Sequence, residues 1–374
     1  MPSQLFSPLH LRQTTLANRI VVSPMCQYSA TDGVPGDWHL MHLGSFAVSG
    51  PGLVFTEATA VEAIGRITPG CTSLYNDQQQ EAWARIVKFM HEHGTAKVGL
   101  QLAHAGRKAS TAAPWLGGKP LAGDGGAWDA IGPSPTPFAD GWPVPVAMDA
   151  KAMDRVKGTF VETAGRALEI GFDLIELHAA HAYLMSSFLS PLSNQRTDDY
   201  GGSRENRMRF PLEVFEAVRA VWPEEKPLGM RISASDWQDD GWTIEDSVAL
   251  TKQLKARGCD FIDCSSGGNT ADRPPVGPGK PGYQVPLAAQ IKREAEIPTI
   301  AVGMIRDPEL AESIVAEGKT DLVALARGML YDPRWSWHAA ETLGAEADYP
   351  PQYARSRPET WPRAFPERTA DAAE

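Results

Sequence analysis

Short apolar segments alternate with longer amphipathic segments along most of the chain. The apolar segments are rich in Val, Ile and Leu, which is typical of parallel strands that are buried on both faces. Eight of them occur, at 18–24, 52–59, 97–104, 173–180, 227–233, 260–266, 298–303 and 321–328. Eight is the number of parallel strands that closes an α/β barrel.

Segments with apolar residues at helical spacing lie between these strands. We expect helices over 78–93, 150–170, 204–221, 243–257, 286–294 and 308–317. Four of them are followed by a glycine that we expect in the left-handed conformation, at Gly94, Gly171, Gly258 and Gly318. An open, doubly wound sheet is the competing architecture, but eight strand-helix units without a second domain favour a single (β/α)8 TIM barrel.

Two segments interrupt the alternation. Residues 107–145 follow the third strand and are dense in Gly, Pro and Trp. We expect a capping excursion that shapes a pocket at one barrel mouth, and a surface loop without function is the alternative. Beyond Leu343 the sequence is rich in Pro and Arg, which excludes a regular element. We therefore expect a barrel domain over 1–343 and an irregular C-terminal arm over 344–374, either a frayed tail or a docking arm.

Composition narrows the class of protein. The length of 374 residues is within the range of one barrel domain. A net charge of -11 argues against a nucleic-acid partner, because such proteins need a basic surface. The N-terminus has no apolar leader and no run of about 18 apolar residues occurs, so we expect a cytoplasmic protein without a membrane partner. The four cysteines form no CxxC pair, and no zinc or iron-sulfur site is expected.

Polar residues gather where the predicted strands end. The loops at the carboxyl ends of barrel strands converge on one mouth, so these residues are expected to form one site. They are Ser23, Pro24, Met25, Cys26 and Tyr28 after the first strand, Gln101 on the third, His178, His181 and Tyr183 after the fourth, Arg231 on the fifth and Arg327 on the eighth.

The HAAH motif places His178 and His181 three residues apart just beyond a strand. Two chemistries use such a pair: hydrogen-bond donors to an oxygen that gains negative charge, or ligands of a metal ion. A metal needs a further ligand, for which His39 and His42 of HLMH are candidates. We favour the binding of an anionic oxygen, and two histidines that only fill the core are the structural alternative.

Three further features indicate a flavin nucleotide. Arg231 lies inside an apolar strand, where a guanidinium needs an anionic partner. A reduced flavin ring and a protein carboxylate are evenly matched candidates for it. Gln101 offers the donor and acceptor that a flavin pyrimidine edge requires. Gly303, Ala326 and Arg327 follow the seventh and eighth strands, where barrels commonly bind phosphate.

Dinucleotide-binding motifs are otherwise missing. The string from Gly277 to Gly282 matches GxGxxG only in its letters, because it contains two prolines and no helix follows. A nicotinamide must therefore bind without a Rossmann domain.

Longer motifs resemble the Old Yellow Enzyme family, and within it the bacterial xenobiotic reductases and NADPH dehydrogenases with an active-site cysteine. The resemblance extends from about Leu5 to Pro333, through LFSPLHLRQTTLANRIVVSPMCQYSA, QLAHAGRK, the run from HAAHAYL to GGSRENR, and LVALARGMLYDP. It implies FMN as cofactor and NADPH or NADH as hydride donor. The implied FMN contacts are Ser23, Pro24, Met25, Cys26, Ala58, Gln101 and Arg231, with Gly303, Ala326 and Arg327 near the phosphate.

The resemblance also implies an ene-reductase. FMN reduced by the nicotinamide would pass hydride from N5 to the β-carbon of an enone, maleimide, nitro compound or quinone. His178 and His181 would bind the substrate oxygen, Tyr183 would protonate the α-carbon and Tyr28 would contact the substrate. Donors at that oxygen stabilise the transition state more than the ground state. A metal-dependent barrel hydrolase that uses the HAAH histidines is the alternative, and a protein that only stores FMN is another.

Two implications concern single residues. Cys26 would tune the flavin potential, although a small buried hydrophobic residue is the commoner fate of a free cysteine. The QYAR sequence at 352–355 resembles a segment that enters a neighbouring subunit's active site. Arg355 is therefore expected to contact substrate across a homodimer or tetramer interface. Because the chain continues further, Trp361 could take that place instead.

Overall fold

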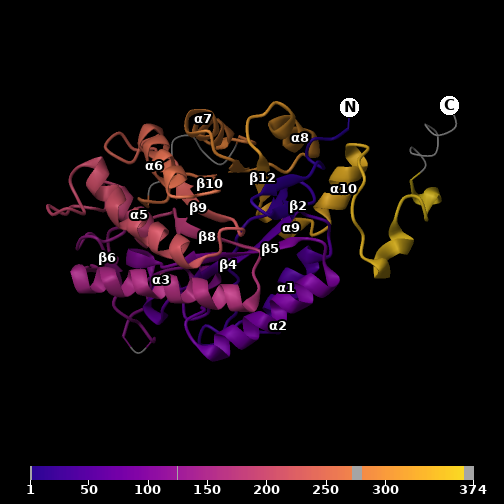
Figure 1. Ribbon diagram of the computed structural model, residues 1–374. Helices are drawn as coiled ribbons and strands as arrows, with labels where there is room; N and C mark the ends of the chain where they lie inside the picture. Colours follow the sequence, from indigo (N-terminus) through magenta and orange to yellow (C-terminus); the bar gives the residue numbers. More distant parts are fainter. Residues whose placement is uncertain (1, 124, 272–279, 366–374) are drawn as a thin grey trace.

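A closed barrel of eight parallel strands forms the centre of the molecule (Figure 1). The computed structural model describes residues 2–123, 125–271 and 280–365. Every predicted strand contains one strand of the barrel, which confirms the (β/α)8 TIM barrel. In barrel order they are β3 (Ile20–Val22), β4 (Leu53–Ala60), β5 (Lys97–Ala103), β8 (Leu174–Ala179), β9 (Leu228–Ser233), β10 (Phe261–Ser265), β11 (Thr299–Val302) and β12 (Leu322–Leu325).

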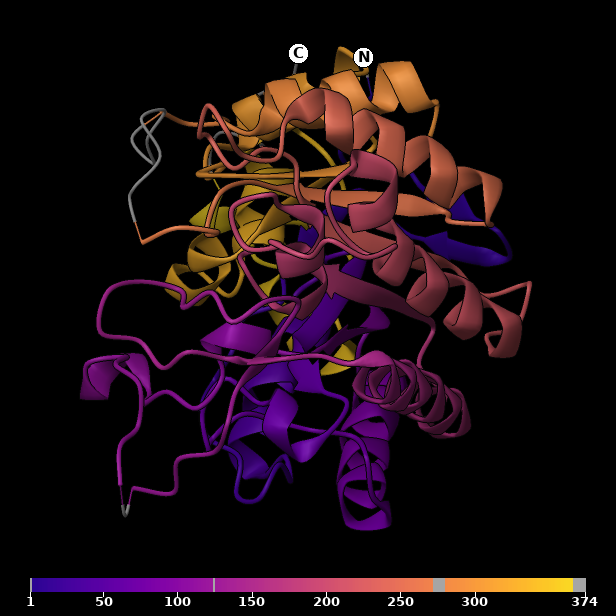
Figure 2. The same cartoon turned by 90° about the vertical axis from the view of Figure 1, so that its left-hand side faces the viewer.

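Helices surround the barrel on its outside, as Figures 1 and 2 show. All six predicted helices are present: α2 (Asp77–His93), α3 (Ala150–Ile170), α5 (Arg204–Val221), α6 (Ile244–Ala256), α7 (Val285–Ala295) and α8 (Pro308–Ala316). The sequence pattern did not indicate α1 (Asp37–Ala47), α4 (Leu184–Leu189), α9 (Arg327–Tyr331) and α10 (Trp335–Thr342). In the part of the chain that the structure describes, no helix has both the length and the apolar character to cross a membrane.

The glycines that follow four helices are not all left-handed. Gly171, Gly258 and Gly318 have φ values of 98°, 85° and 70°, as predicted. The prediction is wrong for Gly94, which is extended with φ −100°. A Cβ at Gly94 would lie 2.6 Å from the carbonyl oxygen of Ala47, so the glycine allows a close approach of two chain segments instead.

The barrel interior is layered, because alternate strand residues point inward. Inward residues of the strands form an apolar cluster, which includes the strand starts and reaches the cavity end of the barrel at Val302 and Ala324: Val21, Leu53, Phe55, Leu174, Phe261, Ile300, Val302, Leu322 and Ala324. Leu11 and Leu16 join this cluster from the hairpin of β1 (Leu9–Leu11) and β2 (Thr14–Leu16), which thus closes the N-terminal end. Polar side chains follow one step further along the strands, toward the opposite mouth.

The excursion at 107–145 covers that mouth, as predicted. It contains η2 (Gly106–Lys108), η3 (Pro114–Leu116) and β6 (Ile131–Gly132), which pairs with β7 (Val146–Ala147). Arg107 donates a 2.6 Å hydrogen bond to the carbonyl oxygen of Asn269 on the far side of the mouth. The Trp115 ring meets the ring of Tyr28 edge-on at 5.7 Å. These contacts attach the excursion to the mouth, and its role in shaping a pocket stays a prediction.

The chain beyond α10 forms an arm that extends away from the barrel (Figure 1). Its described part contains only the short 3-10 helices η4 (Pro351–Ser356) and η5 (Pro362–Ala364). Tyr349 stacks on Trp337 of α10 at 4.3 Å between ring centroids. Arg334 lies over the rings of Trp337 and Tyr353, at 4.6 and 5.1 Å. The base of the arm is therefore fixed to α10 by stacked aromatic and guanidinium groups.

Candidate active site

Three aromatic side chains meet just beyond the end of β8. The ring centroids of His178 and Tyr183 are 4.9 Å apart, and those of His178 and His181 are 5.3 Å apart. Both pairs of rings are nearly perpendicular, at 89° and 86°. The structure thus brings together the two histidines of HAAH and the tyrosine that follows them.

His178 is a neutral ring with a defined tautomer. Its Nδ1 accepts a 3.2 Å hydrogen bond from the backbone N–H of Ala180, so the proton of the neutral ring is on Nε2. Burial, followed by the positive charge of neighbouring groups including Arg231, lowers the pKa of His178 well below its ordinary value. His178 therefore offers an N–H donor without carrying a charge.

His181 is held by two serines from the neighbouring strands. Its backbone N–H donates to Ser233 Oγ at 2.9 Å, and its Nε2 lies 2.7 Å from Ser265 Oγ. His181 has φ +62°, a conformation that is uncommon for any residue except glycine. Burial lowers the pKa of His181 well below its ordinary value, so this ring is also neutral.

Lys108 from the excursion lies beside these rings, and the sequence argument missed it. Its ammonium donates to the carbonyl oxygen of His181 at 2.9 Å and lies 5.3 Å from the centroid of the Tyr183 ring. Burial lowers the pKa of Lys108 to about 8. Burial also raises the pKa of Tyr183 well above its ordinary value, so the phenol keeps its proton at neutral pH.

A cavity of about 410 Å³ opens at the ends of β9 to β12. Four predicted cofactor residues line it: Arg231, Gly303, Ala326 and Arg327. The sequence argument did not identify Tyr283, Gln284, Arg306 and Tyr331, which also line it. The Arg306 guanidinium lies 5.0 Å from the Tyr331 ring centroid, so this wall of the cavity is both cationic and aromatic.

Gly303 in the cavity wall favours glycine for two reasons. Its φ of +128° lies in a region that L residues rarely adopt. A Cβ there would lie 3.0 Å from both the Tyr283 ring and Gln284 Nε2. A side chain at this position would therefore strain the backbone and crowd two other residues of the wall.

Arg231 has the protein carboxylate partner that was one of its two candidates. Its Nε is 3.2 Å from Asp263 Oδ2 on the adjacent strand, while the side chain also lines the cavity. Gln101 donates from Nε2 to Glu176 Oε1 at 2.8 Å. The pairing of Ala58 with Gln101 between β4 and β5 brings a further predicted residue beside this group.

The segment after β3 forms another side of the mouth. Ser23 donates its backbone N–H to Leu325 at 3.0 Å, which brings the segment that contains Pro24 and Met25 beside the end of β12. Cys26 shares a hydrogen bond with Cys71, which raises the pKa of the Cys26 thiol well above its ordinary value. Tyr28 packs edge-on against Trp115 of the excursion at 5.7 Å. After burial, the proximity of Cys26 and Tyr28 contributes to the raised pKa of Tyr183.

The histidines of HLMH are used inside the protein and do not join the HAAH pair. His39 Nε2 lies 3.1 Å from Glu57 Oε1, and both side chains are buried. The His42 ring packs edge-on against Phe46 at 4.9 Å. Within residues 2–123, 125–271 and 280–365, no group of three or more His, Cys, Asp or Glu could hold a metal ion.

Two sequence features lie outside this mouth. Arg355 is exposed on η4 of the arm, which extends away from the barrel of its own subunit (Figure 1). Trp361 is also exposed on the arm. Of the string from Gly277 to Gly282, positions 277–279 lie outside the described residues.

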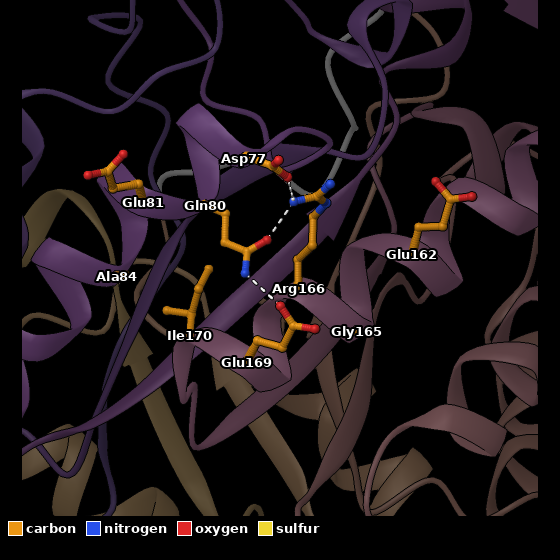
Figure 3. A pocket seen from close by; sticks show the side chains of 9 residues that line it. All are labelled: Asp77, Gln80, Glu81, Ala84, Glu162, Gly165, Arg166, Glu169 and Ile170. Carbon is orange, nitrogen blue, oxygen red and sulfur yellow. Dashed lines mark hydrogen bonds and ion pairs between the residues drawn. The ribbon is translucent and has the colours of Figure 1, made fainter.

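A hollow of about 710 Å³ lies between α2 and α3. Figure 3 shows three hydrogen bonds in it: Arg166 donates to Asp77 at 2.8 Å and to Gln80, which donates to Glu169 at 2.7 Å. Its lining contains none of the residues predicted for the site, so it is not the candidate active site.

Comparison with known proteins agrees with this geometry. Residues 4–346 match the NADH:flavin oxidoreductase / NADH oxidase family. The chain is 44% identical over 361 residues to the NADPH dehydrogenase of Geobacillus sp. (strain WCH70), with 95% of this chain and 99% of the relative covered. It is 43% identical over 357 residues to the NADPH dehydrogenase of Bacillus subtilis (strain 168), with the same coverage. Morphinone reductase in complex with tetrahydroNAD superposes with a TM-score of 0.75 and 26% identity over 96% of this chain and 94% of that chain.

Proposed function

The chain belongs to the NADH:flavin oxidoreductase / NADH oxidase family, and from that premise we propose that it is an ene-reductase that saturates activated carbon-carbon double bonds. Its activity is that of an NADPH dehydrogenase, a flavin oxidoreductase of the Old Yellow Enzyme type with FMN and NAD(P)H. The proposal concerns the substrate class and the residues that act on it. The observation that carries it is the perpendicular arrangement of two neutral histidines and a protonated tyrosine at one mouth.

The residues at the mouth fit FMN. Ser23 Oγ is buried and has no hydrogen-bond partner among the described residues, so it is available to a ligand. Gln101 keeps one N–H and its carbonyl oxygen after bonding Glu176, which matches a pyrimidine edge. The cavity beside Arg231 would take the phosphate at Gly303, Ala326 and Arg327. Pro24, Met25, Cys26 and Ala58 would complete the ring contacts.

When bound, FMN supplies the transfer of hydride from NADPH to the β-carbon of the alkene. His178 and His181 would bind the carbonyl or nitro oxygen of the substrate, which gains negative charge during that transfer. His178 donates from Nε2 because its Nδ1 is occupied. Neutral donors that are already oriented stabilise this charge at little cost in reorganisation.

Ser265 would set the tautomer of His181. Ser265 Oγ is 2.7 Å from His181 Nε2 but 3.5 Å from Gln284 Oε1, which already accepts a 2.6 Å bond from Ser266. The hydroxyl therefore donates to His181 Nε2, and the ring proton is on Nδ1. His181 is thus a second N–H donor for the substrate oxygen.

Tyr183 would deliver the proton that completes the reaction. Its phenol remains protonated at neutral pH because burial raises its pKa. The ring contacts His178, so a substrate whose oxygen is bound by the histidines has its α-carbon near the phenol. Tyr28, which packs against Trp115 of the excursion, would contact the outer part of the substrate.

We propose that the arm, 344–374, acts between subunits of a homo-oligomer and is distinct from the barrel domain, 1–343. Arg355 and Trp361 are exposed and lie on a segment that extends away from the barrel. Either side chain could then enter the mouth of a neighbouring subunit. Light scattering of the full chain would test the oligomer, and separate Arg355→Ala and Trp361→Ala variants would show which residue lowers the substrate KM.

An absorption spectrum of the purified protein tests the main proposal. Flavin bands should bleach on anaerobic addition of NADPH and return on addition of cyclohexenone. A protein that oxidises NADPH but is not re-oxidised by enones, maleimides or nitroalkenes would remain a flavin oxidoreductase and refute the ene-reductase assignment. A protein that is colourless, takes up no FMN and loses activity with a chelator would support the barrel hydrolase instead.

A further inference from the structure

Four polar side chains form a layer inside the barrel, directly beneath the mouth. This interior polar layer consists of Gln101 on β5, Glu176 on β8, Arg231 on β9 and Asp263 on β10. Each side chain belongs to a residue that is at most 7% exposed. Strand pairing sets Gln101 beside Glu176, and Arg231 beside Asp263. The apolar cluster lies below this layer and the cavity lies above it.

The two carboxyl groups of the layer have different partners. Glu176 Oε1 accepts the 2.8 Å hydrogen bond from Gln101 Nε2, and Asp263 Oδ2 is 3.2 Å from Arg231 Nε. Glu176 Oε2, Asp263 Oδ1 and Arg231 Nε have no hydrogen-bond partner among the residues that the structure describes, so the contact between Arg231 and Asp263 is an ion pair without a hydrogen bond. Two buried carboxyl groups therefore share one guanidinium, and that guanidinium is paired with Asp263.

The charges of the layer balance only if one carboxyl group is protonated. An uncompensated carboxylate in a dry interior is very costly, and such a group becomes neutral instead. Asp263 has the ion pair with Arg231, so Glu176 is the group that takes the proton. Burial, and then the charge of Asp263, raises the pKa of Glu176 well above its ordinary value, in agreement with this assignment.

The hydrogen bond to Glu176 Oε1 defines the orientation of Gln101. Oε1 of Glu176 is an acceptor, so the carboxyl proton is on Oε2. Gln101 must then present its amide nitrogen to Glu176, and its carbonyl oxygen points elsewhere. Without Glu176 the amide could rotate by half a turn and exchange its donor and acceptor.

We propose that Glu176 is a positioning residue that, as a neutral carboxylic acid, holds the Gln101 amide in the single orientation that serves the pyrimidine edge of FMN. This inference rests on the proposed placement of Gln101 beside the flavin. Glu176 would act on the flavin only through Gln101. Glu176 itself would not contact the cofactor.

A double-mutant cycle on FMN affinity tests the proposal. The dissociation constant of FMN is measured by flavin fluorescence on apoprotein of four forms: wild type, Glu176→Met, Gln101→Met and the double variant. We expect about a tenfold weaker binding for Glu176→Met, since one oriented hydrogen bond is lost. In the Gln101→Met background the same change should have no further effect, because the group that it orients is gone. Additive effects would overturn the positioning role.

A second variant, Glu176→Gln, tests whether Glu176 is protonated. It provides a test even if Glu176→Met does not fold. Glu176→Gln keeps the carbonyl acceptor for Gln101 and is neutral, so its FMN affinity should stay within about twofold of wild type and its flavin midpoint potential should be unchanged. The infrared difference between wild type and Glu176→Gln should show one protonated carboxyl band. A raised potential in Glu176→Gln would mean that a negative charge had been removed, which refutes protonation. If Gln101→Met alone leaves FMN affinity unchanged, the proposed contact between Gln101 and the flavin is wrong. That result is distinct from a failure of the positioning role of Glu176.

Discussion

Replacement of His178 by alanine should slow the reaction of the reduced enzyme with cyclohexenone by about 10² to 10³. Loss of one oriented donor to a developing oxyanion costs roughly 2.7 to 4 kcal/mol, and about 1.36 kcal/mol corresponds to a factor of ten in rate. The structure places the effect in this range because His181 remains as a second donor. His178 is also buried, so water reaches the vacated position only in part.

The assay follows flavin re-oxidation in an anaerobic stopped-flow instrument after stoichiometric reduction, normalised to bound flavin. The rate of the wild type should be independent of pH between about 6 and 7, below the titration of Lys108 at about 8, because burial lowers the pKa of His178 and the ring is neutral throughout. An imidazolium donor would instead lose rate as the pH rises through its pKa.

His10→Ala is the matched control, since His10 is exposed on β1 at the opposite end of the barrel and its ring hydrogen-bonds to Thr15. It should re-oxidise at the wild-type rate. Equal rates for wild type and His178→Ala would refute the assignment of this histidine to the substrate oxygen.

Three other changes give separable outcomes. Tyr183→Phe should lower the turnover of simple enones by about 10² to 10⁴. The loss should be much smaller for very electron-poor alkenes, because these can take a proton from water. An equal loss for both classes in steady-state assays would contradict the proton-donor role. Ser265→Ala should slow enone reduction by releasing the His181 tautomer, whereas Ser313→Ala, which removes a hydroxyl that donates to Leu310 of the same helix α8, should not; kcat values of the two variants provide the comparison. His42 has a pKa of about 4 in the folded protein, mainly through burial, against about 6.5 unfolded, so the unfolded state binds the proton first as pH falls. Stability should therefore be lost between pH 6.5 and 4, and the fall that urea unfolding measures between pH 7 and 5 should be about 2 kcal/mol smaller in His42→Phe than in wild type, because the other buried histidines still contribute in both.

The barrel strands were predictable because each is buried on both faces and is predominantly apolar, with few polar residues inside it. The hairpin β1–β2 was not, since strands of three residues leave too short a pattern to separate from a loop. Helix α1 was not predicted, for a different reason. Its HLMH sequence suggested metal ligands, whereas His39 is paired with Glu57 inside the protein.

The site was predictable where a residue conflicts with its own surroundings. Arg231 was predicted as a site residue because it is a charged residue in an apolar strand. The same argument applies to Glu176 in DLIELHAA and Asp263 in DFIDCSS. Applied consistently, it would have found the whole interior polar layer. Lys108 and Arg306 gave no such signal, because a basic residue in a loop is ordinary until the fold shows what it faces.

The manner in which the excursion is attached bears on how substrate preference can be altered. Its ends are anchored to the mouth, by Arg107 to Asn269 and by Arg196 to the carbonyl oxygens of Pro133 and Met148, whereas Trp115 at its outer part is largely exposed. The outer part can thus be exchanged for a longer or shorter sequence while the barrel folds as before. An engineer could vary the size and polarity of accepted alkenes in this one replaceable stretch and leave the reducing machinery untouched.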